Sequence, residues 1–294
     1  MKYTDIFTTL DDFRHYADGL QADTTLRQLA PSLRTTALEM EKIITKAAFA
    51  AIASGSWTPE ATEANPEPAA IDLSDALDLL KTALASGTMY RYQIFAAVKR
   101  NGSDASIYKY QHEELKDSYV ENYWRAMDDL LLFLDENPTI AGYDKTDDYT
   151  DRQALPVKNA DEFEHYFGIG RSSFFYAKVL YLIRDSWKTI SVRIRGHESD
   201  EAVMDTAKKA LCYTVIAKVV KRFDLTEFPR SIRFDYNHEY TRGSSTAGRD
   251  ALYADLMHEA SLAMDEVGRQ IRFSSDSSPL VNSNEEKDKF YGAL

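Results

Sequence analysis

The chain has 294 residues, of which 44% are hydrophobic and 12% aromatic, and this composition is typical of a folded protein with a substantial core. The formal net charge of −12 argues against nonspecific nucleic-acid binding, which needs clustered lysine and arginine side chains to displace counterions. We therefore expect no sequence-specific nucleic-acid partner. A local basic patch at Lys208, Lys209, Lys218, Lys221 and Arg222 is the one alternative.

The single cysteine, Cys212, excludes an intrachain disulfide and a zinc site built from several cysteines. It lies in an apolar run, which predicts a small buried core residue. No apolar segment follows Met1 as in a signal peptide, and no run approaches the roughly 18 apolar residues of a membrane span. We expect no membrane partner and synthesis in a cytoplasm.

Periodic apolar residues predict helices in the first half of the chain. Thr9 can cap a short helix that carries acidic residues in its first turn. The other expected elements are a helix over residues 31–53 opened by Pro31, a loop over 55–71, a helix over 72–98 that Gly87 kinks or breaks, and a helix over 115–136. Asn137 and Pro138 should end the last of these.

The second half repeats this character after a segment rich in Asp, Thr and Tyr. Helices are expected over residues 172–196, 199–223 and 246–271, and little or no sheet anywhere. The polar stretch that follows predicts an extended C-terminal tail.

Two hexamers with the pattern acid-acid-Phe-x-His-Tyr lie 150 positions apart, at residues 11–16 and 161–166. Further pairs follow in the same order, including Ile52 opposite Val192 and Ala83-Leu84 opposite Ala210-Leu211. These anchors predict an internal duplication. The alternative is a chance alignment of unrelated helical segments.

The predicted fold class is all-α, with two related helical modules, short irregular segments and an extended C-terminal tail. The modules span residues 1–138 and 157–272, the linker 139–156 and the tail 273–294. A pseudo-symmetric body of this kind suits an assembly of repeated subunits.

Each hexamer contains an acid-x-x-His pair, which on a helix places a carboxylate and an imidazole on one face. Asp12 with His15, and Glu162 with His165, could therefore be ligands of a di-iron type helical bundle. Such a site also needs glutamates from two other helices, and the sequence does not supply a matching set. The favoured interpretation is structural: the acid stabilises the helix start, and we expect no metal or other cofactor.

The pairs His112-Glu113 and His238-Glu239 could each provide a general base with its orienting carboxylate. No recognisable nucleophile motif or phosphate-binding loop accompanies them. We therefore predict structural turns at these positions, no catalytic residues and no enzyme activity.

The sequence resembles an uncharacterised family of phage and prophage structural proteins from gut anaerobes. The residues that carry the likeness are Phe7–Phe13, Leu33–Ile52, Phe163–Phe175 and Phe228–Arg233. The resemblance implies a virion structural role at the head–tail junction, where helical adaptor proteins form rings beneath the portal. It brings no catalytic residues with it.

The expected function is a ring-forming head–tail connector or neck adaptor subunit. Its partners would be copies of itself and portal or tail proteins of the same particle. The alternative is a metal-dependent enzyme that uses the His and carboxylate pairs. The expected partner-contact residues lie in the loop over 55–71 and in the tail: Trp57, Pro59, Glu60, Phe273, Phe290, Tyr291 and Leu294.

Overall fold

The computed structural model describes residues 3–20, 23–61, 67–100, 109–224, 227–229 and 245–276. Helices dominate these residues, and the sheet among them pairs two strands of two residues each, so the predicted all-α class is confirmed. No helix in these ranges is long and apolar enough to cross a membrane.

The chain divides into two compact units. Unit 1 comprises residues 1–181 and 223–243, and unit 2 comprises residues 182–222 and 244–294. The division falls inside one helix, whereas the predicted modules end and begin at residues 138 and 157. The duplication therefore stays a prediction.

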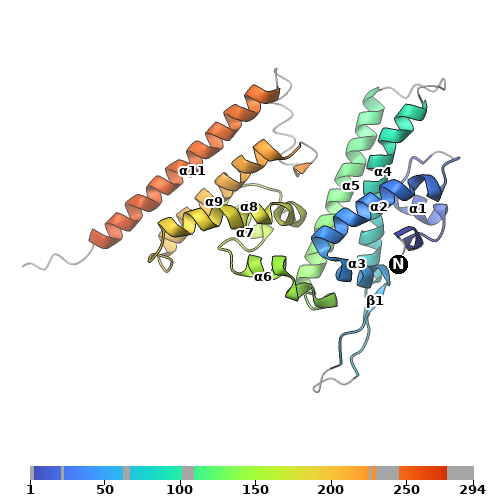
Figure 1. Cartoon of the computed structure of the whole chain (residues 1–294), viewed down its shortest axis with the longest axis horizontal. Helices are drawn as coiled ribbons and strands as arrows, with labels where there is room; N and C mark the ends of the chain where they lie inside the picture. The colour runs from blue at the N-terminus through green and yellow to red at the C-terminus, as the bar shows by residue number, and fades with distance from the viewer. Residues whose placement is uncertain are drawn as a thin grey trace, which may run out of the picture. The chain divides into compact units, whose positions relative to one another are not determined.

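Unit 1 is built from short helices around a long helical hairpin (Figure 1). In chain order its elements are η1 (Tyr3–Ile6), α1 (Leu10–Tyr16), α2 (Leu26–Ile44), α3 (Lys46–Ala53), β1 (Ser56–Trp57), β2 (Ile71–Asp72), α4 (Ser74–Arg100), α5 (Lys109–Glu136), η2 (Ile140–Lys145), α6 (Asp147–Gln153), α7 (Ala160–Tyr166) and the first part of α8 (Ser173–Arg193). Helix α4 packs along α5, and α2 packs across α4.

The start of α2 differs from the prediction. The helix begins at Leu26, because Thr25 and Gln28 form a capping box in which the Thr25 N–H donates to Gln28 Oε1 over 2.8 Å. Pro31 lies inside the helix, where it costs one backbone hydrogen bond. The predicted single helix over 31–53 is also interrupted at Thr45, whose positive φ of 73° ends α2, and whose hydroxyl caps α3.

Gly87 neither kinks nor breaks α4, which runs through it without interruption. A Cβ at this position would lie 2.6 Å from Thr36 Cγ2 and 3.1 Å from the Tyr123 ring. The glycine therefore allows α2, α4 and α5 to approach closely. The residues predicted as a linker, 139–156, form η2 and α6, and Ile140 and Tyr143 are buried.

Unit 2 contains the end of α8, helix α9 (Glu201–Arg222) and helix α11 (Ser245–Asp276), and α9 and α11 pack along each other. In the middle of α11 every third or fourth residue is buried, namely Leu256, Ala260, Ala263 and Val267. Cys212 on α9 is fully buried, so the prediction for this residue is confirmed. Helix α11 continues past residue 273, where the tail was predicted to begin.

The order of helices in the two halves is similar. The predicted duplication pairs helices α1, α2, α4 and α5 with helices α7, α8, α9 and α11. The buried positions of α4 and α9 also share one spacing: Ala76, Leu80, Ala83, Leu84 and Met89 correspond to Val203, Ala207, Ala210, Leu211 and Ile216. The predicted pairing of Ile52 with Val192 lacks this agreement, because Ile52 is buried and Val192 is 59% exposed.

Candidate functional site

Helices α1 and α7, which hold the two hexamers, have the same local geometry. Each has seven residues, and the residue before each accepts a hydrogen bond from a backbone N–H of the first turn. Thr9 Oγ1 accepts from the Asp12 N–H over 3.0 Å, and Asn159 Oδ1 accepts from the Glu162 N–H over 2.8 Å. Both helices therefore begin with a side-chain cap.

The acids of the acid-x-x-His pairs complete these caps. Asp12 Oδ2 accepts from the Thr8 N–H over 3.0 Å, and Glu162 Oε2 accepts from the Lys158 N–H over 2.7 Å. Lys81 also donates to Asp12 Oδ1 over 3.1 Å. Partial burial opposes ionisation of Asp12, but the hydrogen bonds from Thr8 and Lys81 hold its pKa below the usual value. Both carboxylates thus have structural partners.

The histidines of the two pairs are exposed and lie edge-on to the tyrosine that follows. The ring centroids are 5.0 Å apart for His15 and Tyr16, and 5.0 Å apart for His165 and Tyr166. Within the described ranges, no group of three or more His, Cys, Asp or Glu residues could hold a metal ion. The four candidate ligands thus lie at matching positions of two short helices, with the acids in the first turn and the histidines in the last turn.

The turn predicted at His112 and Glu113 is wrong, because the backbone of both residues belongs to helix α5. Their side chains lie outside the described residues, as do His238 and Glu239 altogether. The predicted contact residues Phe290, Tyr291 and Leu294 also lie outside them.

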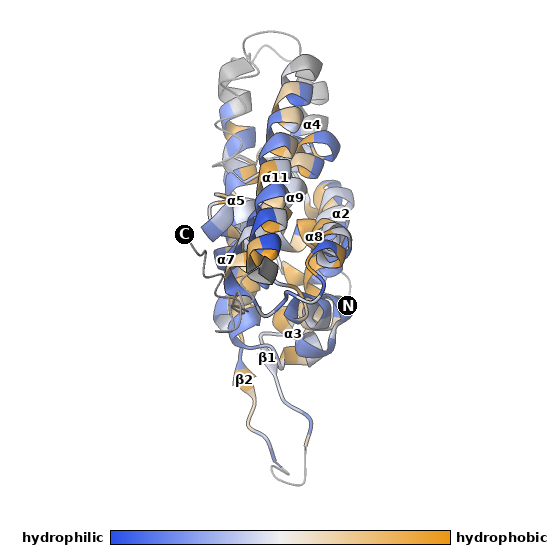
Figure 2. Ribbon diagram, turned by 90° about the vertical axis from the view of Figure 1, so that its left-hand side faces the viewer, coloured by the Kyte–Doolittle hydropathy of each residue, from blue (hydrophilic) through white to orange (hydrophobic). Residues whose placement is uncertain are grey.

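The predicted contact residues of the 55–71 loop lie on an arm that projects from unit 1 (Figures 1 and 2). Its base is the antiparallel pair β1–β2, in which Ser56 pairs with Asp72 and Trp57 with Ile71. Trp57 and Pro59 are half-buried and Glu60 is exposed. Phe273, near the end of α11 in unit 2, is 74% exposed.

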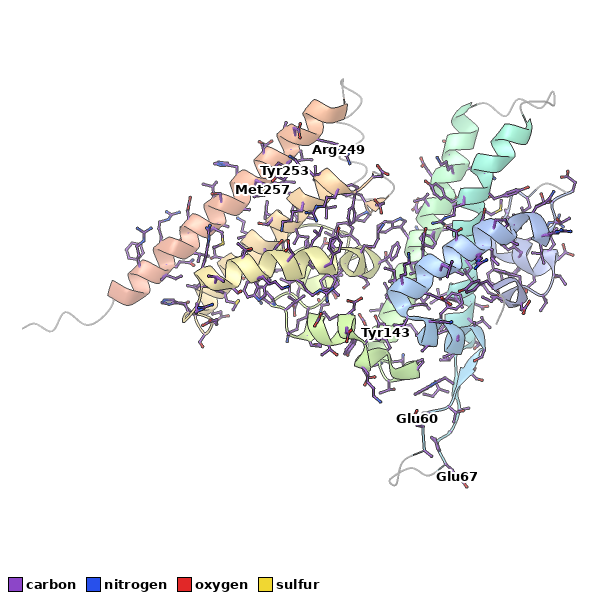
Figure 3. The ribbon with its side chains drawn as sticks, in the orientation of Figure 1. Glu60, Glu67, Tyr143, Arg249, Tyr253 and Met257 are labelled. Carbon is purple, nitrogen blue, oxygen red and sulfur yellow. The ribbon has the colours of Figure 1, made fainter. Side chains whose placement is uncertain are left out.

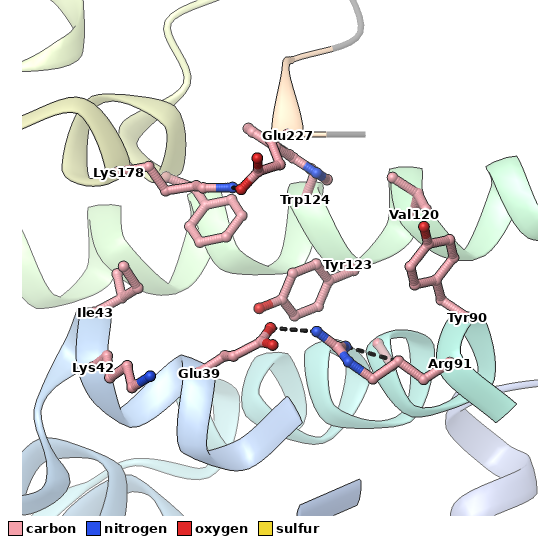
Figure 4. Close-up of a pocket in the computed structure, with 12 residues that line it drawn as sticks. Glu39, Lys42, Ile43, Tyr90, Arg91, Val120, Tyr123, Trp124, Lys178 and Glu227 are labelled. Carbon is pink, nitrogen blue, oxygen red and sulfur yellow. Dashed lines mark hydrogen bonds and ion pairs between the residues drawn. The ribbon is translucent and has the colours of Figure 1, made fainter. Parts of the chain in front are cut away.

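A pocket of about 360 Å³ lies within unit 1 (Figure 4). Helices α2, α4, α5 and α8 contribute to its wall, together with Glu227 from the segment after α9. Four of its lining residues are aromatic, namely Tyr90, Tyr123, Trp124 and Phe174, and five are charged, namely Glu39, Lys42, Arg91, Lys178 and Glu227. The pocket is large enough for a small organic molecule.

Two ion pairs lie on opposite sides of the pocket (Figure 4). On the α2–α4 side, Arg91 pairs with Glu39 and donates to Thr36 Oγ1 over 3.0 Å. On the other side, Lys178 Nζ lies 3.0 Å from Glu227 Oε1.

The Lys178 ammonium also lies in a cage of aromatic rings. It is 5.6 Å from the ring centroid of Trp124, 5.7 Å from that of Phe174 and 5.4 Å from that of Phe223. The hydrogen bond and ion pair from Lys178, together with the backbone N–H of Asp224, hold the pKa of Glu227 below its usual value despite partial burial. Lys178 and Glu227 therefore neutralise each other's charge.

Asp128 on α5 fixes the start of α8 and so places Phe174 at the pocket. Its Oδ1 accepts from the Ser172 hydroxyl and the Phe174 N–H, both over 2.8 Å. Burial raises the pKa of Asp128 to about 6, although these two hydrogen bonds lower it.

Sequence reasoning did not find this pocket. Lys178 and Glu227 carry no motif in the sequence. Their proximity depends on packing between segments that are far apart in sequence, for which a single sequence has no signal.

Fold and pocket together define an all-α protein with an aromatic, charged cavity in one unit and a projecting arm. No known protein family, curated protein sequence or solved structure matches the chain.

Proposed function

We propose that the chain is a structural subunit of a phage-like particle, a ring-forming head–tail connector or neck adaptor. Its partners are further copies of the chain and the portal or tail proteins next to it, and its location is the virion. The resemblance of the sequence supports this role, and the arm on unit 1 is the structural observation on which it depends.

The arm has the features of a contact element. Its base is held by the β1–β2 pair and by a hydrogen bond of 3.0 Å from the Leu73 N–H to the Gly55 carbonyl. Beyond the base, Glu60 and Glu67 are exposed and lie away from the helices of unit 1 (Figure 3). A segment that leaves its own domain gains burial by lying on a neighbour.

The charge of the arm indicates what it contacts. Residues 58–70 contain three glutamates and neither lysine nor arginine. A neighbouring surface with exposed lysine or arginine side chains would complement it, and such complementarity fixes register and favours correct encounter. We expect the arm of one subunit to lie against a basic surface of the next.

An arm deletion tests this role. Replacing residues 58–70 by Asn-Gly would join Trp57 to Ile71 through a two-residue hairpin and keep the strand pair. We expect the wild-type protein to form closed rings by mass photometry, and the deletion variant to remain monomeric with an unchanged melting temperature. As a matched control, the double variant Glu60→Gln, Glu67→Gln keeps the arm but removes two of its charges. Its rings should be weaker than those of the wild type at low salt, and the difference should shrink as salt screens the charges.

A wild-type protein that stays monomeric at micromolar concentration would contradict the proposal, and so would an arm deletion that still forms rings. Metal analysis addresses the enzyme alternative. Stoichiometric iron or manganese that is lost in His165→Ala would favour the enzyme.

A further inference from the structure

We propose that the pocket of unit 1 binds a small planar aromatic acid. This inference concerns ligand binding and is independent of the connector role. It depends on the shape and lining of the cavity and on two hydrogen-bond donors that no described residue satisfies.

The first consideration is size and wall chemistry. A cavity of about 360 Å³ is at the small end of the range for ligand pockets. Its aromatic residues come from three helices, with Tyr90 on α4, Tyr123 and Trp124 on α5, and Phe174 on α8. Rings from three directions favour a flat aromatic ligand, which gains contact area and ring–ring interactions.

The second consideration is charge. Arg91 is paired with Glu39, and Lys178 is paired with Glu227. Lys42, whose side chain is exposed at the rim, is the fifth charged residue of the lining, and no ion pair joins it to another described residue. The lining therefore carries one positive charge in excess, which favours a ligand with one negative charge.

The third consideration is the Tyr123 hydroxyl, which points into the pocket (Figure 4). Burial, and to a lesser degree the negative charge of Glu39, raise the pKa of Tyr123, so the phenol keeps its proton and can donate. No hydrogen bond joins this hydroxyl to another described residue. Together with the Lys42 ammonium it offers donors, and a carboxylate is the acceptor that suits both.

The same contacts argue against an organic cation. The cage formed by Trp124 and Phe174 already holds the Lys178 ammonium, and Glu227 neutralises it. A cationic ligand would have to displace a lysine that is covalently part of the wall.

Three probes that share one ring system test the charge preference: indole-3-acetate, neutral indole and cationic tryptamine. Binding to the full chain would be measured by ligand-observed NMR titration, with 4-hydroxyphenylacetate as a second acid. We expect saturable binding of both acids, weaker binding of indole and the weakest binding of tryptamine.

Two variants locate the binding. Lys42→Met should weaken indole-3-acetate binding about tenfold, since a charged hydrogen bond is lost, and leave indole binding unchanged. Tyr123→Phe keeps the ring and should weaken binding of both acids severalfold. Lys46→Met removes an exposed lysine of α3 outside the pocket lining and should have no effect.

Three results would overturn the proposal. They are no saturable binding of either acid at millimolar concentration, tryptamine binding as tightly as indole-3-acetate, and unchanged acid binding in a Lys42→Met variant with the wild-type melting temperature.

Discussion

Asp128 gives unit 1 a dependence on pH. Its folded-state pKa of about 6 lies above the usual aspartate value, so the folded state keeps a proton that the unfolded chain releases. The stabilisation is fully present below about pH 4 and is lost as the pH rises to about 6. Above that range the buried carboxylate is charged.

We expect Asp128→Asn to abolish this dependence, because the amide oxygen can still accept from Ser172 and Phe174 but does not titrate. The stability of the wild type relative to the variant should fall by about 1–3 kcal/mol between about pH 4 and about pH 7. Urea unfolding at the two pH values measures it. The same difference in the free energy of unfolding between wild type and variant at both pH values would contradict the prediction.

Two nearby residues in the hexamer of α7 contribute differently to stability. Phe163 is fully buried, whereas His165 is exposed. Phe163→Ala should cost about 3–5 kcal/mol of stability through the cavity that it leaves. His165→Ala should change stability by less than about 0.5 kcal/mol, as is usual for an exposed position. Urea unfolding followed by circular dichroism tests both, and a large loss in His165→Ala would show that the imidazole contributes to stability.

For single residues, the sequence predicts interactions between positions that are close along the chain. The Thr9 cap and the Asp12 acid lie within three residues of each other, so their pattern identifies the start of α1. The salt bridge from Lys81 to Asp12 joins residues 69 positions apart and has no sequence signal. Spacing alone therefore left open whether Asp12 was a ligand or part of a cap.

Within the elements, Gly87 illustrates how packing overrides helix propensity. In an open helix, replacing glycine by alanine stabilises by up to about 1 kcal/mol. Gly87→Ala should instead destabilise, because the new methyl group meets Thr36 and the Tyr123 ring. Gly268→Ala on α11 is the matched control, since the nearest atom to its Cβ would be the end of Arg272 at 4.0 Å.

We expect the melting temperature to fall in Gly87→Ala and to stay the same or rise in Gly268→Ala. Equal shifts in the two variants would mean that the close approach of α2, α4 and α5 is not important for stability. The sequence predicts a kink or break at Gly87 because glycine inside a helix lowers the stability of that helix. The structural reason, space for two neighbouring helices, exists only in the folded chain.

Helix identity is predictable from periodicity, and helix contacts are not. The apolar faces of α4, α9 and α11 follow the expected spacing of three and four residues. Pro31 predicts a helix start because proline is common in the first turn, but the capping box at Thr25 starts α2 six residues upstream. The pocket was missed because it needs four helices at once.

For the whole molecule, α11 is the partner that α9 requires. Helix α9 buries residues around most of its circumference, including Val203, Leu211 and Val215, and α11 packs along it. A chain truncated after residue 243 would lose α11 and leave apolar surface uncovered.

We expect the 1–243 truncation to be largely insoluble, whereas a 1–276 truncation should stay soluble with an unchanged melting temperature. The sequence predicts partner-contact residues in the tail, so the 1–276 protein should also fail to assemble. Size-exclusion chromatography and thermal unfolding of the two truncations decide this. A stable, soluble 1–243 protein would contradict the assigned role of α11.

The buried thiol of Cys212 can report on opening of the core of unit 2. Burial raises the pKa of this thiol, and a thiol that is neither exposed nor ionised does not react. It is also the only cysteine in the chain, so a thiol-specific mass tag can report on one position alone. The rate of tagging then measures how often the core around α9 opens in the native protein, and it does so without any engineered label.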